Sequence, residues 1–343
     1  MSLMAALAVL AALVLAAVVA QGAWSARKAK PRRADAPAVD GARTEPTMNA
    51  AVVQPGEALG ELRSVGSRKL SARLDPLIDA IAPIMLEAPI SGEMALMHLP
   101  PSRRAGTKPF LIEGLNAESA DWELPNAGQR YSEFQAGVQM ANRSGALNEI
   151  EFSEFVQKLQ AFAESVGGMV EVPDMLDVVA RARELDAFAS GHDAQLAIML
   201  RANGAAWSVG YIQQMANRRG FVAGVLPGRL VLPAAEEGAP PVLVLSFDAQ
   251  AALAEDPNIS SVREVTLSLD VPQTAESAEP FPAWHDAARN LCADMDATTV
   301  DDRGQPITLH AFAGIGNDLS TLYLALESRD LAAGSQAARR LFS

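Results

Sequence analysis

The side chains that could take part in chemistry are few in this sequence and stand far apart along the chain. The four histidines are His98, His192, His285 and His310, and none has a second histidine or a carboxylate at the three- or four-residue spacing of a metal motif. For each, a hydrogen-bonded or exposed histidine is the simpler interpretation. Cys292 is the only cysteine, which excludes an intrachain disulfide and a cysteine-based zinc site and fits a reducing compartment.

The closest pair of carboxylates is Asp301 and Asp302. Because Arg303 and Gly304 follow, this stretch predicts a turn rather than a general acid–base pair. His285 and Asp286 are adjacent, so on a helix we expect their side chains to point apart. We therefore predict no catalytic residue, no cofactor and no metal. An enzyme, such as a membrane-anchored hydrolase, is kept only as an alternative because no nucleophile–base pair is visible.

Charge is unevenly distributed over the 343 residues, of which 49% are apolar. Residues 1–72 hold nine Lys and Arg and five Asp and Glu, so their net charge is +4. Because the whole chain carries −13, the remaining residues carry −17. An acidic remainder repels phosphates and disfavours nucleic acid as a partner. The apolar content is sufficient for one or two hydrophobic cores.

The N-terminus predicts a membrane anchor. Residues 3–20 read LMAALAVLAALVLAAVVA, without charge or proline. At about 1.5 Å per residue, such a helix spans roughly 27 Å, enough for a hydrocarbon core. Trp24 suits the headgroup level, and five basic residues follow at Arg27, Lys28, Lys30, Arg32 and Arg33. Since Lys and Arg stay on the cytoplasmic side, we predict a single-pass anchor over residues 1–24 with the N-terminus outside and the remainder in the cytoplasm.

A cleaved signal peptide is the alternative. It would carry its positive charge before the apolar run, whereas here the charge comes after it. Residues 25–72, first basic and then rich in Ala and Pro, show no sustained apolar period, so we expect a flexible linker.

Residues 74–191 predict a first α+β unit. Apolar spacing indicates a helix beginning at Leu74 in the stretch LDPLIDAIAPIML, and an amphipathic helix over residues 151–166. Asp174 is placed to cap a further helix. The expected strands cover residues 94–99, 110–115, 133–140 and the stretch MVEV.

Residues 192–343 predict a second unit. Residues 262–271 alternate apolar and polar side chains, which is typical of a half-buried strand in an antiparallel sheet. Strands are also expected at residues 194–200, in GRLVLP and in PPVLVLSF. Helices are expected at residues 205–219, from Pro280, at residues 308–327 and at the C-terminus.

The same order of elements occurs twice. A strand, a helix, a short strand and a helix cover residues 133–188, and the same series covers residues 262–327. We therefore expect two related α+β units, the first shorter, each with a mostly antiparallel sheet and helices on one face. One larger domain with an irregular N-terminal half is the alternative.

The layout and several motifs resemble the ZipA family of bacterial cell-division proteins. The resemblance is best over residues 193–312, in the strand QLAIML, the helix ending RRGF, the strand VTLSLDVPQ, the helix from Phe281, and VDDRGQPIT before a last helix. The anchor and linker also agree with that family. Residues 74–191 have no counterpart in its shorter members, so their role stays open and we treat them as an accessory unit.

The resemblance implies a domain over residues 192–343 that binds the C-terminal peptide of FtsZ, the tubulin-like ring protein, and tethers the division ring to the inner membrane. In the family, the peptide docks as a helix on the sheet. The implied face consists of Leu196, Ile198, Leu230, Leu232, Val244, Ser246, Thr266 and Ser268. Ser246, Asp248 and Ser268 are polar where the family would have apolar residues, so the groove has moved, binding is weak, or the first unit contributes.

A non-catalytic cytoplasmic scaffold for a different protein partner is the second hypothesis. In both hypotheses the lipid bilayer is contacted through residues 3–20, and neither nucleic acid nor a small-molecule substrate is expected.

Overall fold

Two antiparallel sheets organise the part of the chain that the computed structural model describes: residues 74–236, 238–254, 256, 260–301, 303–307 and 309–343. The expected α+β class with antiparallel sheets is confirmed. The expected anchor and linker lie outside these residues. Within them, no helix combines the length and apolar character needed to cross a membrane.

The first sheet is built from strands whose apolar residues alternate. In spatial order it contains β2 (Arg104–Ala105), β3 (Lys108–Asn116), β5 (Arg130–Gln139), β1 (Asp79–Ser91) and β8 (Gly168–Val170), with β4 (Trp122–Glu123) paired to β3. Phe134, Ala136 and Val138 of β5 are fully buried, as the alternation in residues 133–140 predicts. The strand expected at residues 110–115 is also confirmed.

Three helices belong to this sheet: α2 (Gly92–His98), α3 (Glu149–Val166) and α4 (Met175–His192). The start of α3 is fixed by a capping box, in which Asn148 accepts the N–H of Glu151 at 3.0 Å and Glu151 accepts the N–H of Asn148 at 3.3 Å. The helix ends at Gly167, whose φ of 69° favours glycine. The expected cap Asp174 accepts the N–H of Leu176 at 2.8 Å.

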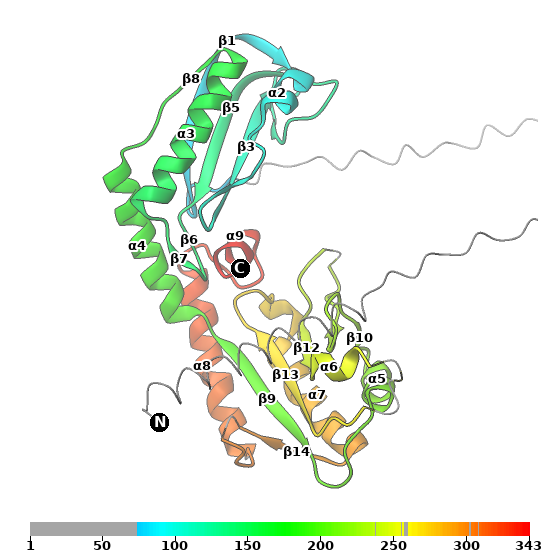
Figure 1. Cartoon of the computed structure of the whole chain (residues 1–343). Helices are drawn as coiled ribbons and strands as arrows, with labels where there is room; N and C mark the ends of the chain where they lie inside the picture. Colours follow the sequence, from blue (N-terminus) through cyan, green and yellow to red (C-terminus); the bar gives the residue numbers. More distant parts are fainter. Residues whose placement is uncertain (1–73, 237, 255, 257–259, 302, 308) are drawn as a thin grey trace, which may run out of the picture. The chain divides into compact units, whose positions relative to one another are not determined.

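Aromatic side chains of α3 form the core of the first sheet. Phe155 meets Phe110 of β3 edge to face with 5.5 Å between ring centroids, and Phe162 meets Phe134 of β5 at 5.4 Å. All four rings are buried. This face of the sheet is therefore covered by α3 (Figure 1).

Two expectations for the first sheet are wrong. The stretch from Leu74 is a turn followed by β1, not a helix. Ala80 and Ile84 lie on the buried face, as expected for alternating positions of a strand. Pro83 also disfavours a helix, because it has no N–H for a hydrogen bond in a helix interior. The strand expected at residues 94–99 is α2, because Ser91 caps this helix by accepting the N–H of Met94 at 3.3 Å.

The second sheet has the spatial order β10 (Val222–Ala223), β11 (Arg229–Leu232), β12 (Leu243–Ser246), β13 (Glu264–Asp270), β9 (Gln195–Ala202) and β14 (Ala297–Val300). Val265, Leu267 and Leu269 are buried, which confirms the alternation expected in residues 262–271. Helices α5 (Val209–Arg218), α7 (Pro280–Met295) and α8 (Leu309–Glu327) pack on the same face, and a short α6 (Ala249–Ala252) follows β12. Trp284 of α7 also donates its indole N–H to the carbonyl of Leu267 at 3.1 Å.

The two sheets share one pattern of strand pairing. Strand β1 pairs with β5 and β8, as β9 pairs with β13 and β14, and all these pairs are antiparallel. The next neighbour of β5 is β3, and that of β13 is β12. Each series continues with a helix, a short strand and a helix, so the pairing supports the repeat that the order of elements predicts.

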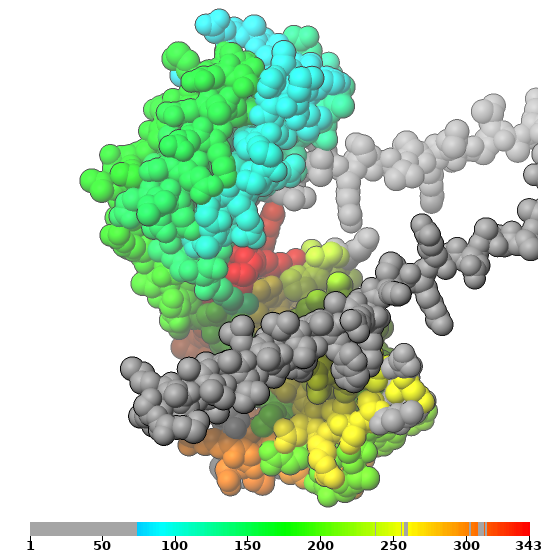
Figure 2. All heavy atoms as spheres, viewed as in Figure 1, coloured from blue at the N-terminus to red at the C-terminus, as the bar shows by residue number. Residues whose placement is uncertain are grey.

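The C-terminal helix α9 (Gln336–Leu341) belongs to a cluster that contains residues from both halves of the fold. Leu341 and Phe342 pack with Ile78, with Ala189 of α4 and with Leu326 of α8. Arg340 also binds both carboxylate oxygens of Asp79, at 2.5 Å and 2.7 Å. Figure 2 shows these red C-terminal residues against residues of the first sheet's half. The two sheets are therefore parts of one compact unit.

Candidate partner-binding face

One face of the second sheet carries the helices, and the other face carries two cross-strand rows of partly or fully exposed side chains. The register places Ala197, Ser268, Val244, Val231 and Val222 opposite one another in the first row. The second row consists of Met199, Thr266, Ser246 and Arg229. Directly opposed residues of antiparallel strands share a face, so these nine form one surface, which we call the open face.

Only half of the residues that the family resemblance implied belong to this open face. Val244, Ser246, Thr266 and Ser268 lie on it. The other four are a correction: Ile198 and Leu230 are buried in the core, and Leu196 and Leu232 pack against it. Because strand side chains alternate, a register error of one residue exchanges the two faces.

The sequence-based prediction therefore missed Ala197 and Met199 on β9, Arg229 and Val231 on β11 and Val222 on β10. The available signal was the alternation itself, since Leu200 and Leu230 point into the core and their neighbours must point away.

Two hydroxyl groups of the open face donate hydrogen bonds within the sheet. Ser268 donates its hydroxyl to the carbonyl of Val244 at 3.3 Å, and Ser246 approaches the carbonyl of Thr266 at 3.5 Å. Since these hydroxyls already have acceptors, an apolar partner covering them would leave few hydrogen bonds unmade. The polar substitutions thus reduce the apolar area of the face without making it strongly hydrophilic.

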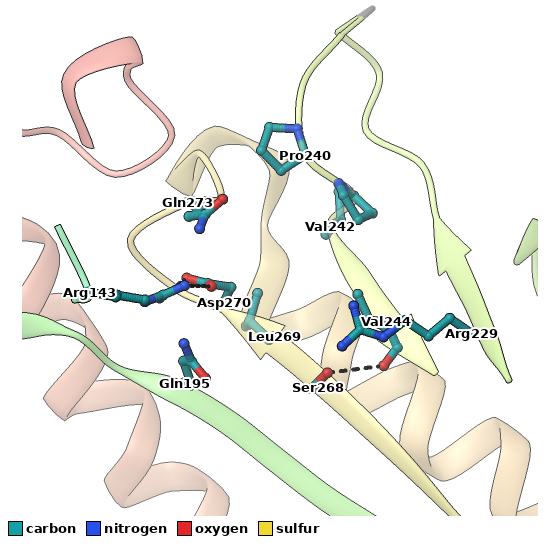
Figure 3. A pocket seen from close by; sticks show the side chains of 11 residues that line it. Arg143, Gln195, Arg229, Pro240, Val242, Val244, Ser268, Leu269, Asp270 and Gln273 are labelled. Atoms are coloured by element: carbon teal, nitrogen blue, oxygen red, sulfur yellow. Dashed lines mark hydrogen bonds and ion pairs between the residues drawn. The ribbon is translucent and has the colours of Figure 1, made fainter. Parts of the chain in front are cut away.

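A pocket of about 350 Å³ lies at one end of the open face (Figure 3). Its apolar wall consists of Val244 from the sheet and of Pro240, Pro241 and Val242 from the connection between β11 and β12, and it also borders Leu269, whose side chain is buried in the core. Its polar residues are Arg143, Gln195, Arg229, Ser268, Asp270 and Gln273. Pockets that combine an apolar wall with a few polar groups are typical of ligand and peptide anchors.

Arg143 comes from the turn between β6 (Ala141–Asn142) and β7 (Gly145–Ala146), which belong to the half of the fold that holds the first sheet. Its guanidinium binds Asp193 at 2.6 Å and Asp270 at 2.7 Å. The hydrogen bonds with Asp193 and then Asp270 raise the pKa of Arg143 above its ordinary value, so it stays charged. The first unit therefore contributes one wall of the pocket, and the two carboxylates around Arg143 more than neutralise its charge.

The residues first considered for chemistry remain apart. Asp301 accepts the N–H groups of Arg303 and Gln305 at 2.9 Å and 2.7 Å, which confirms a turn. His285 Nδ1 lies 3.7 Å from Asp286 Oδ1, so the expectation that their side chains point apart is wrong. Cys292 is half-buried, and burial raises the pKa of its thiol to about 11.

His192 is held by its own helix. His192 Nδ1 lies 2.7 Å from the carbonyl of Phe188, and its ring stacks on Phe188. Among the residues that the structure describes, no three His, Cys, Asp or Glu side chains gather as metal ligands. In comparisons with known proteins, no family model matches the chain, and no curated protein matches it at a significant level.

Proposed function

We propose that this chain is a membrane-anchored cell-division protein that binds the C-terminal peptide of FtsZ on the open face of its second sheet. The proposal combines the sequence resemblance of residues 193–312 with the expected N-out anchor and linker. The bound ring protein would then be tethered and stabilised at the bacterial inner membrane. The mechanism is binding and raised local concentration, without a chemical step.

The observation that carries the proposal is the uncovered face beside a fully packed core. Helices α5, α7 and α8 cover the side of Leu267, whereas Val244, Val231 and Met199 lie on the side without helices. An antiparallel sheet with one solvated face can accept an amphipathic helix by packing its apolar side chains. Such docking needs a hydrophobic centre, which the row from Ala197 to Val222 supplies.

The binding site would be displaced from the family position towards the pocket. Small or hydroxyl side chains at Ser268 and Ser246 offer no large anchor, whereas Val244, Pro240 and Pro241 line the pocket together with Arg229. Arg229 is an exposed cation that can pair with a carboxylate of the peptide. We therefore expect an apolar side chain of the tail in the pocket and an acidic group near Arg229.

A test is calorimetry with a synthetic FtsZ C-terminal peptide and the full chain in detergent or nanodiscs. Saturable binding that a Val244→Glu substitution abolishes supports the proposal. If the chain captures a second protein equally well from cells with intact FtsZ and from cells whose FtsZ lacks its tail, the chain is a scaffold for a different partner. The mixed polar and apolar character of the open face keeps that second function open.

A further inference from the structure

The outer face of the first sheet carries a second cross-strand row, independent of the open face. The register places Met169, Met85, Glu133, Leu115 and Trp122 opposite one another on β8, β1, β5, β3 and β4. Because directly opposed residues share a face, these five side chains form one line, which we call the methionine row. The exposed fractions are 69% for Met169 and 53% for Met85, while Leu115 and Trp122 are half-buried.

The charges at the methionine row are acidic. Glu133 lies in its centre and is exposed. Glu171, also exposed, follows β8 and donates its backbone N–H to the carbonyl of Pro83 on β1 at 3.0 Å. The five positions of the row and the adjacent positions 83, 113, 135 and 171 include no Lys or Arg. Arg130, at the start of β5, donates to the carbonyl of Pro89 at 2.9 Å. The surface therefore complements a positively charged partner and repels an anionic bilayer.

Part of the same face is covered by the chain itself. The N–H of Leu74 donates to Glu113 Oε1 at 3.2 Å, and a Cβ on Gly137 would approach Leu74 Cδ2 to 2.5 Å. Arg340 covers Asp79 farther along β1. The covered positions are buried, whereas Met85 and Met169 are exposed, so the methionine row is the part of this face that a partner can reach.

We propose that the methionine row binds a basic amphipathic helix of a partner protein. Apolar side chains of that helix would pack on Met85, Met169 and Leu115, and its Lys or Arg side chains would pair with Glu133 and Glu171. Flexible methionines adapt to varied apolar surfaces and are frequent where helices of different sequence dock. The basic segment at residues 27–33 of this chain fits the charge but has no large apolar residue, so it does not fit the row.

The test observes the methionines directly. The full chain is labelled with carbon-13 in its methionine methyl groups and observed by NMR. The added probe is a synthetic amphipathic helix of leucine and lysine. The signals of Met85 and Met169, assigned with Met→Leu variants, should shift and saturate. The signals of Met215 and Met295, buried beneath the second sheet, should not move. A matched peptide with glutamate in place of lysine should leave all four unchanged.

Charge reversal gives the decisive variant. Glu133→Lys should weaken binding of the basic peptide about tenfold, since it replaces attraction by repulsion in the middle of the contact. Glu184→Lys makes the same change on an exposed position of α4 and should have no effect. Equal binding of the acidic peptide, or an unchanged affinity in Glu133→Lys, would overturn the proposal.

Two other occupants would also overturn it. Shifts of Met85 and Met169 that depend on protein concentration without peptide would show that a second copy covers the row. In the other case, the signals of Met85 and Met169 differ between the full chain and a 74–343 fragment while the full chain does not respond to the peptide. That result would show that the chain's own N-terminal segment covers the methionine row. The fragment retains every core residue of both sheets.

Discussion

Ser268 of β13 lies directly opposite Val244 of β12 and donates its hydroxyl to the carbonyl of Val244 at 3.3 Å (Figure 3). The pair belongs to the open face and lines the pocket. A serine hydroxyl that already donates to the neighbouring strand needs fewer hydrogen bonds from water. This relation makes the open face compatible with an apolar partner although its sequence contains hydroxyl residues.

Enlarging this serine should strengthen binding. In Ser268→Met, the added apolar area should contact the docked tail, and burial of a methionine contributes about 1 kcal/mol or more. We expect an affinity for the FtsZ peptide about fivefold higher, with an almost unchanged melting temperature, because position 268 points away from the core. Calorimetry and thermal unfolding measure both. Weaker binding with an intact fold would place the peptide elsewhere.

The ion pair between Arg340 and Asp79 should stabilise the fold. The Asp79 side chain is fully buried and that of Arg340 is 20% exposed. Arg340→Ala leaves a carboxylate without its partner, and such a loss lowers the free energy of unfolding by about 3 kcal/mol. Arg183→Ala, which breaks the exposed pair with Glu149, should lower it by about 0.5 kcal/mol or less. Denaturant unfolding of both variants compares them, and equal losses would contradict this role.

Acid should destabilise the first unit through Glu151. Burial acts to raise the pKa of Glu151, but hydrogen bonds from Thr107 and Asn148 and the charge of Lys108 outweigh it, so the pKa lies below the ordinary 4.5. A carboxyl with a lowered folded-state pKa contributes stability above its unfolded pKa and loses it as the pH falls through the folded one. The free energy of unfolding should therefore fall below about pH 4.5.

The matched variant for this pH dependence is Glu151→Gln. It should be less stable at pH 7 and should show a shallower loss on acidification, whereas Glu184→Gln on the exposed surface of α4 should behave as the parent. Denaturant unfolding between about pH 3 and 7 measures the slopes. An acid slope as steep in Glu151→Gln as in the parent would contradict the assignment.

The second sheet should be less stable without the first. In a 192–343 fragment, Leu326, Leu341 and Phe342 would lose their contacts with Ile78 and Ala189, and Arg340 would lose Asp79. Exposing a cluster of large apolar residues lowers stability and promotes association. We expect the 74–343 fragment to remain monodisperse, judged by light scattering, and to melt at a higher temperature. Equal melting temperatures and equal monodispersity would show that the shared cluster contributes little.

Sequence periodicity predicted most elements of the fold because their patterns were long and had clear ends. Residues 262–271 alternate without interruption, and residues 151–166 combine a helical stripe with glycines beyond it. Residues 74–86 failed because Leu74, Leu77, Ile78 and Ile81 have helical spacing, although Pro83 and the pairing with β5 make a strand. Tertiary pairing, which a single sequence does not display, decided that case.

The site was predicted only in part for a related reason. Alternation tells which residues of one strand share a face, but not which faces of neighbouring strands coincide. Leu196 and Ile198 were therefore grouped with Thr266 and Ser268, although the register aligns Thr266 with Met199. The contribution of Arg143 to the pocket could not be foreseen, because it lies far from Asp270 in the sequence and comes from the other half of the fold.

The most direct measurement is the affinity of an FtsZ C-terminal peptide for the full chain and for two variants, by calorimetry or anisotropy. Val244→Glu places a charge in the middle of the open face, and Leu324→Glu makes the same change on an exposed position of α8, on the helical side of the sheet. The account predicts saturable binding by the parent and by Leu324→Glu, and at least a tenfold loss in Val244→Glu. Absence of binding by the parent, or equal binding by all three proteins, would contradict it.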